Sequence, residues 1–257
     1  MSSTSSSPIR AVLERTLRTA GDVALSHFRN TPATHKNDGS LVTAADKEIE
    51  EYLCESLAVA FPGVGLIGEE GTRVDGADRW YIDPIDGTTA FVQGLAHWGP
   101  TVCLVRDGQL SVGAFYVPRL DEFWFAERGR GAWLGDTRLR PSNPEEVATQ
   151  DAMFAPSHFH RGAPIPWPGK VRALGSTAAH LALVAGGSGV LTIIPRWQLW
   201  DIGCGVLLME EAGRRVCDAT GGEVEVATCR VGLPILAGAP TALNLMTMDG
   251  WAQRALE

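Results

Sequence analysis

The sequence predicts a mixed fold, with an α+β pattern in the N-terminal half and an α/β pattern in the C-terminal half. Two amphipathic helical patterns come first, short apolar segments separated by turn residues follow, and strands then alternate with helices. The chain has 257 residues, of which 45% are hydrophobic and 20% are charged. It can therefore bury a substantial core, as a typical globular protein does.

A first helix is predicted from Ser7-Pro8 to about residue 29. Apolar side chains recur at helical spacing from Ile9 to Phe28, and a serine followed by a proline is a typical helix start. Residues 1–7 lack the apolar core of a signal peptide and consist almost entirely of serine. They are predicted to form a disordered tail.

A second helix is predicted after a polar segment at residues 30–40. Thr43 and Asp46 have the spacing of a capping box, and apolar residues at positions 49, 53 and 57 continue the helix to Phe61. Strands are then predicted at residues 64–67, 80–82, 101–105, 111–117, 122–126 and 131–134. Asp107-Gly108 joins two of them in a hairpin. Residues 8–140 are therefore predicted to be an α+β subdomain, with two helices followed by an antiparallel meander.

Polar residues at positions 141–150 predict a joint between two subdomains. Beyond this joint, strands are predicted at residues 152–155, 171–174, 190–194 and 235–236, and helices at residues 176–185, 200–212 and 241–256. Such alternation is typical of an α/β layer, so residues 141–257 are predicted to be a C-terminal α/β subdomain.

Composition excludes several classes of partner. The formal net charge is −8 and no run of Lys or Arg stands out, which argues against binding to nucleic acid. No apolar run approaches the roughly 18 residues of a membrane span, so no membrane partner is expected. The five cysteines are widely spaced without a C-x-x-C pair. We interpret them as reduced core residues, which indicates a cytoplasmic protein.

The most informative motif lies at residues 80–91, where a short apolar strand leads to Asp83 and Asp86. Pro84 between them fixes the backbone, and Gly87 lets the chain approach a ligand closely. The amides of the following Thr88-Thr89 turn can meet an anion. Hard oxygen ligands beside free amides suit a divalent metal together with a phosphate group.

Other acidic residues have alternative interpretations. Asp46 and Asp201 stand at predicted helix starts and can be caps, Glu69 and Glu70 can belong to a solvated loop, and Asp83 with Asp86 can be a turn. Several carboxylates in one cleft, however, repel one another unless cations neutralise them. Because the motifs contain no His or Cys, Mg²⁺ or Mn²⁺ is favoured over zinc.

In these motifs the chain resembles the inositol monophosphatase family of metal-dependent, lithium-sensitive phosphatases. The resemblance runs from about residue 8 to the last helix and is carried by five motifs in order. They are residues 41–46 (LVTAAD), 68–70 (GEE), 83–88 (DPIDGT), 175–179 (GSTAA), and 200–201 (WD) followed by 211–213 (EAG). It implies the sugar-phosphatase fold, an αβαβα sandwich of alternating helix and sheet layers, and a homodimer.

The resemblance also implies roles for individual residues, with two or three Mg²⁺ per subunit that Mn²⁺ can replace. Glu69, Asp83 and the Ile85 carbonyl would hold one ion; Asp83, Asp86 and Asp201 would hold a second; and a third, weaker ion would lie near Glu69. Gly87, Thr88 and Thr89 would bind phosphate, and Thr88 with Glu69 would orient the attacking water. Asp46 and Thr43 would support them, with Lys36 and Asp38 on a loop over the metals.

The predicted reaction is hydrolysis of a small phosphomonoester, and the substrate is inferred from two sequence features. Inositol-specific members carry an acidic residue where this chain has Ile194, whereas His97-Trp98-Gly99 resembles the histidinol-phosphate phosphatase branch. Histidinol phosphate is therefore the preferred substrate, followed by inositol phosphate and then by sugar or nucleotide phosphates. Arg196 is a candidate substrate contact. The non-enzymatic alternative is a protein that senses metal or phosphate, and His158 with His160 is interpreted as an ordinary loop rather than a metal site.

Overall fold

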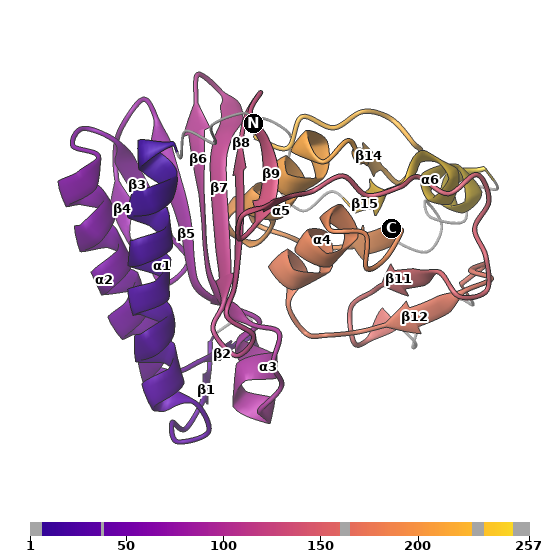
Figure 1. Cartoon of the computed structure of the whole chain (residues 1–257). Helices are drawn as coiled ribbons and strands as arrows, with labels where there is room; N and C mark the ends of the chain where they lie inside the picture. The colour runs from indigo at the N-terminus through magenta and orange to yellow at the C-terminus, as the bar shows by residue number, and fades with distance from the viewer. Residues whose placement is uncertain (1–6, 37–38, 160–164, 228–233, 249–257) are drawn as a thin grey trace.

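Helices and sheets alternate in five layers (Figure 1). The first layer is the helix pair α1 (Pro8–His27) and α2 (Ala44–Ala60), which packs on an eight-stranded sheet. The third layer is α4 (Thr177–Ala185) with α5 (Leu199–Glu211), and it separates this sheet from a five-stranded sheet. Helix α6 (Pro240–Thr247) covers the far side. The predicted αβαβα sandwich is confirmed.

This computed structural model describes residues 7–36, 39–159, 165–227 and 234–248. Predictions for most of the N-terminal tail and for Asp38, His160, Cys229 and the end of the last helix lie outside the described residues. Ser7 itself occupies the N-cap position of α1 and is only 9% exposed, so it does not belong to a tail. Its side chain makes no capping hydrogen bond, which corrects the predicted cap; its carbonyl oxygen accepts from Arg10 and Ala11 instead.

The predicted capping box of α2 is present. The Asp46 carboxylate accepts hydrogen bonds from the backbone N–H of Thr43, at 2.7 Å, and from its hydroxyl, at 2.6 Å. The apolar face of α2 buries Ile49 and Leu53 completely against the sheet, where they share a core with Trp80. Burial of such side chains contributes about 1.5–3 kcal/mol each, which fixes the helix on the sheet.

The eight-stranded sheet has the order β10-β9-β8-β7-β6-β5-β3-β4. Its strands are β3 (Gly65–Gly68), β4 (Arg73–Val74), β5 (Arg79–Asp86), β6 (Gly99–Arg106), β7 (Gln109–Val117), β8 (Glu122–Glu127), β9 (Gly131–Leu134) and β10 (Thr137–Arg138). From β5 to β9 it is the predicted antiparallel meander, which β10, a strand that was not predicted, continues. The β3–β5 pair, however, is parallel, which the predicted meander does not contain. In this parallel pair Gly68, the last residue of β3, lies opposite Ile82, so Glu69 follows β3 beside Asp83 of β5.

A short helix, α3 (Thr88–Gln93), follows β5 where the sequence predicted only a turn. The ladder between β5 and β6 shifts register between Asp83 and Asp86, at the proline. Gly87 then adopts a φ of 91°, a left-handed conformation that favours glycine. The chain thereby turns sharply between Asp86 and the first helical residue.

The five-stranded sheet has the order β12-β11-β13-β15-β14 and is of mixed direction. Its strands are β11 (Ala152–Phe154), β12 (Lys170–Arg172), β13 (Leu191–Ile194), β14 (Arg215–Asp218) and β15 (Ile235–Gly238). Strand β14 was not predicted, nor was the short hairpin of β1 (Thr34–His35) and β2 (Leu41–Val42).

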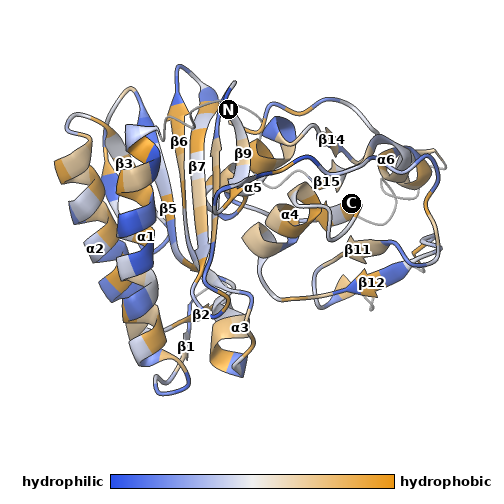
Figure 2. Cartoon of the chain, in the orientation of Figure 1, coloured by the Kyte–Doolittle hydropathy of each residue, from blue (hydrophilic) through white to orange (hydrophobic). Residues whose placement is uncertain are grey.

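Residues of high hydropathy are concentrated along the central strands and on α4 and α5 (Figure 2). One core cluster joins the two halves of the chain, because residues such as Phe115 and Trp124 of the large sheet pack with Leu181 of α4 and Ile202 of α5. The four described cysteines are buried and free, as expected of reduced core residues. In the described segments no helix is both long enough and apolar enough to cross a membrane.

Candidate active site

A cavity of about 230 Å³ brings together the ends of β3 and β5, the start of α3 and the starts of α4 and α5. Its lining residues are Ser40, Leu41, Glu69, Asp83, Ile85, Asp86, Gly87, Thr88, Thr89, Gly175, Thr177 and Asp201. All five predicted metal ligands and the predicted phosphate-binding turn are therefore neighbours in space. They come from stretches of chain more than a hundred residues apart.

Glu69 enters this cavity directly after β3. Its backbone N–H donates to the carbonyl of Ile82 at 3.0 Å, which holds it beside β5. Lys36 Nζ lies 2.7 Å from Glu69 Oε1 and 2.6 Å from Glu70 Oε1. Burial alone would lower the pKa of Lys36, but the hydrogen bonds to the two glutamates raise it above its usual value. The lysine therefore stays charged and is the local counter-ion of both carboxylates.

Asp83 is 3% exposed, and its Oδ1 accepts a hydrogen bond from the backbone N–H of Ile85 at 2.9 Å. Burial raises the pKa of Asp83 well above its usual range, and the nearby carboxylates of Glu69, Asp86 and Asp201 raise it further. Such a carboxylate takes up a proton unless a cation is close by.

Asp86 connects β5 to the N-terminus of α4. Its Oδ2 accepts hydrogen bonds from the Ser176 hydroxyl and, at 3.0 Å, from the backbone N–H of Ala178. The Ser176 hydroxyl oxygen in turn accepts from the Ala179 N–H at 3.0 Å and caps α4. Burial raises the pKa of Asp86 to about 7 although these donors lower it. This contact anchors the carboxylate across the two halves of the chain.

Asp201 lies in the first turn of α5, as predicted. Its Oδ2 accepts a hydrogen bond from the backbone N–H of Gln198 at 2.6 Å, in a capping box. Burial raises the pKa of Asp201 to about 8, with further contributions from the charges of Asp86 and Glu69. The helix thus positions a carboxylate opposite the end of β5.

Thr88 opens α3, and its hydroxyl reaches two acceptors. These are Asp46 Oδ1 at 3.3 Å and the carbonyl of Ile85 at 3.2 Å. Asp46 is 1% exposed and Thr43 is 3% exposed, so both lie behind the cavity rather than in it. A Cβ atom on Gly87 would come within 2.9 Å of Ser176 Cβ, which is why the turn needs glycine both for its φ and for its space.

These donors suit a hard divalent cation. The acidic groups offer only oxygen atoms, and no histidine or cysteine is among the described residues that line the cavity. In the described part of the chain no three His, Cys, Asp or Glu side chains already form a ready-made ligand group. Glu69 Oε1 accepts from Lys36 and Asp86 Oδ2 accepts from Ser176, so these contacts engage one oxygen of each carboxylate.

Some predicted residues do not line the cavity. Arg196 is exposed on the connection between β13 and α5, and His158 lies on an exposed turn after β11. Lys36 reaches the cavity only through Glu69. Sequence reasoning assigned no role to Ser176 or Glu50, although both hold acidic loops in place. Ser176 has the pattern of a helix cap, but its partner Asp86 is 90 residues away.

The model of the inositol monophosphatase family matches residues 5–244. An inositol-1-monophosphatase of Mesorhizobium japonicum is 35% identical over 208 residues, covering 76% of this chain and 78% of that protein. A histidinol-phosphatase of Chlorobaculum parvum is 31% identical over 206 residues, covering 76% and 79% respectively. The solved structure of the extragenic suppressor protein SuhB of Bartonella henselae superimposes with a TM-score of 0.84 at 27% identity, covering 98% of this chain and 99% of that one.

Proposed function

Because the chain belongs to the inositol monophosphatase family, we propose that it hydrolyses a small phosphomonoester with Mg²⁺, and that histidinol phosphate is its substrate. The chain is a phosphoric monoester hydrolase, and members of this family depend in general on a metal ion. One observation carries the proposal for the site. Glu69, Asp83, Asp86 and Asp201 line the same cavity as the glycine turn that opens α3.

Glu69, Asp83, Asp86, Asp201 and the Ile85 carbonyl would hold two or three Mg²⁺. When bound, the ions supply positive charge that lowers the pKa of the attacking water and neutralises the phosphate oxygens. The pKa values of Asp83, Asp86 and Asp201 are raised, and a bound cation would keep these three carboxylates ionised. Mn²⁺ can substitute, because it accepts the same oxygen ligands.

The protein's own groups bind and orient the reactants. The backbone N–H groups of Gly87, Thr88 and Thr89 would donate hydrogen bonds to the phosphate oxygens, since a positive φ at Gly87 turns the chain toward the cavity. The Thr88 hydroxyl, held by Asp46, and the Glu69 carboxylate would orient the water for attack on phosphorus. Thr43 fixes Asp46 through two hydrogen bonds. When the cavity holds no cation, Lys36 would balance the charge of Glu69.

The environment of Ile194 supports the choice of substrate. It is 3% exposed and belongs to the core between the sheets, so it offers no acceptor to a ring hydroxyl. Trp98 is also buried and its indole N–H donates to the Leu95 carbonyl at 2.9 Å, so it supports the loop without facing a ligand. Inositol phosphate is the second candidate, favoured by the relative from Mesorhizobium japonicum. Arg196 stays a proposed contact to the part of the substrate that extends from the cavity.

The test is phosphate release from a panel of esters with and without Mg²⁺. We expect histidinol phosphate to be hydrolysed fastest, Li⁺ to inhibit, and the protein to elute as a homodimer. Asp83→Asn and Asp201→Asn should each abolish turnover while leaving the circular dichroism spectrum unchanged. Near-normal activity in either folded variant would remove this cavity from consideration. Turnover of histidinol phosphate no faster than of an aryl phosphate would refute the substrate but not the reaction.

A further inference from the structure

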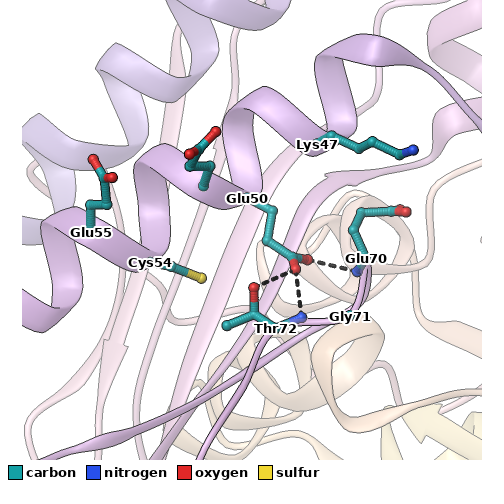
Figure 3. A pocket seen from close by; sticks show the side chains of 8 residues that line it. Lys47, Glu50, Cys54, Glu55, Glu70, Gly71 and Thr72 are labelled. Carbon is teal, nitrogen blue, oxygen red and sulfur yellow. Dashed lines mark hydrogen bonds between the residues drawn. The ribbon is translucent and has the colours of Figure 1, made fainter.

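A second groove, of about 450 Å³, lies on the other side of the Glu69–Glu70 loop, between that loop and α2 (Figure 3). Glu50 lines this groove and is buried, with 4% of its surface exposed. Its Oε2 accepts from the Glu70 N–H at 2.7 Å, and its Oε1 accepts from the Thr72 N–H at 3.0 Å and the Thr72 hydroxyl at 2.7 Å. Figure 3 shows these three bonds converging on one carboxylate.

The donors explain why an acidic side chain is buried here. No ion pair is recorded for Glu50 within the described residues, so its charge is stabilised by neutral donors alone. A carboxylate is an acceptor through both oxygens, whereas an amide at this place would oppose its N–H₂ group to at least one donor of the loop. An apolar residue would leave the N–H groups of Glu70 and Thr72 without this partner, which is unfavourable for buried donors.

The loop that Glu50 holds carries Glu69. On one side of Glu69 the chain bonds to β5 through the Ile82 carbonyl, and on the other side Glu70 and Thr72 bond to Glu50. Gly68 makes room for this contact, because a Cβ atom there would overlap the Glu50 carboxylate. The backbone on both sides of Glu69 is therefore fixed between β5 and α2.

The same face of α2 also fixes the opposite side of the cavity. Asp46 lies one helical turn before Glu50, so their side chains project in the same direction about 6 Å apart along the axis. Asp46 accepts from the Thr88 hydroxyl, and Glu50 accepts from the loop that bears Glu69. One rigid helix therefore sets the distance between the two groups that orient the attacking water.

We propose that Glu50 is a positioning residue of the metal site, which sets Glu69 relative to Thr88 through the loop at residues 69–72. The proposal rests on the proposed function, because Glu69 matters in this way only if it binds a metal ion. Glu50 does not touch substrate or metal. Its effect passes through the backbone of Glu70 and Thr72.

The experiment compares four variants. Thr72→Val removes one donor to Glu50 without changing the shape of the side chain, and Thr72→Ser restores it. Glu50→Gln opposes an amide N–H₂ to the loop. Glu55→Gln is the matched control, since Glu55 lies in the same groove on the same helix but is exposed, and no hydrogen bond to it is recorded among the described residues. Because Thr72 is only partly buried, its variants test the proposal even if Glu50→Gln fails to fold.

Three quantities are measured: Mn²⁺ binding to the substrate-free protein by electron paramagnetic resonance, hydrogen exchange of the loop amides, and kcat with KM for the ester. For Thr72→Val and Glu50→Gln we expect Mn²⁺ binding to weaken on the order of threefold to tenfold, with faster exchange at residues 70 and 72. The kcat should fall, whereas KM should change less than twofold. Thr72→Ser and Glu55→Gln should match the wild type.

Two outcomes separate this inference from the proposed function. If Thr72→Val and Glu50→Gln only lower the melting temperature and bind Mn²⁺ like the wild type, Glu50 is structural and the positioning role is refuted. If the wild type binds Mn²⁺ in a way that depends on Glu50 and Thr72 but releases no phosphate from any ester, the positioning role holds and the proposed function fails.

Discussion

Ser176→Ala should weaken the contact between Asp86 and the N-terminus of α4, which links the two halves of the chain. The Ser176 hydroxyl does two things at once: it donates to Asp86 Oδ2 and accepts from the Ala179 N–H at the start of α4. The residue is 2% exposed, so water does not replace either bond after the substitution. Asp86 would keep the Ala178 N–H as its donor from α4.

The expected loss follows from these two bonds. Removing a serine N-cap costs about 1 kcal/mol, and removing a hydrogen bond to a charged group costs about 1.5–3 kcal/mol. Because one hydroxyl makes both bonds, the costs are not fully additive, and we expect the free energy of unfolding to fall by about 2–4 kcal/mol. The Ser176 hydrogen bond lowers the pKa of Asp86, so the variant should also have a higher pKa at that carboxylate.

Urea unfolding at pH 8 in metal-free buffer measures this loss. Ser26→Ala is the control, because Ser26 is exposed and its hydroxyl donates to the Val23 carbonyl of its own helix, at 2.7 Å. It should change the free energy of unfolding by less than about 0.5 kcal/mol. A change below about 0.5 kcal/mol for Ser176→Ala as well would mean that the two hydrogen bonds of Ser176 do not stabilise the fold, which would refute this prediction.

Two further predictions concern stability. His180 is 4% exposed, accepts from the Leu174 N–H at 3.0 Å, and has its pKa lowered to about 4 by burial. The unfolded chain binds a proton at His180 more tightly than the folded chain does. The stability that neutral His180 contributes is therefore complete above pH 6.5 and is lost toward pH 4, by on the order of 3 kcal/mol. Urea unfolding at pH 7.5 and 4.5 should show a smaller pH dependence of the free energy of unfolding in His180→Gln than in the wild type, and equal dependence would contradict the assignment. Gly87→Ala should lower the melting temperature more than Gly63→Ala does. Both glycines have positive φ, but the added methyl would lie 2.9 Å from Ser176 Cβ at Gly87 and would meet no atom within 4 Å at Gly63. Equal shifts would show that the space around Gly87 is not limiting.

Local patterns were enough to predict most helices and strands. The apolar spacing from Ile9 to Phe28 predicted α1 to within two residues of its observed end, and Asp107-Gly108 predicted the β6–β7 hairpin. Each of these signals lies within a few residues of the element that it predicts. The capping box at Thr43 is of the same kind, because its donor and acceptor are three residues apart.

Long-range pairing could not be predicted in this way. The parallel β3–β5 pair was missed, since nothing within β3 distinguishes a parallel neighbour from an antiparallel one. The bond between Ser176 and Asp86 and the bonds of Glu50 to the Glu69–Glu70 loop join residues that are 20 to 90 positions apart. The family motifs located the acidic residues, but only the fold shows which groups hold them in place.

For the acidic residues, a position at a helix N-terminus and a role in or beside the cavity are compatible. Among the described contacts, Asp46, Asp86 and Asp201 each use Oδ2 at the N-terminus of a helix, with donors from α2, α4 and α5 or the residues just before them. In Asp46 the other oxygen, Oδ1, accepts from Thr88, on the cavity side. A carboxylate with one oxygen fixed at a helix N-terminus has a defined orientation for the second, and the helix dipole favours its negative charge. The capping pattern in the sequence is therefore part of how the site is built, because it orients acidic groups that burial and mutual repulsion would otherwise displace.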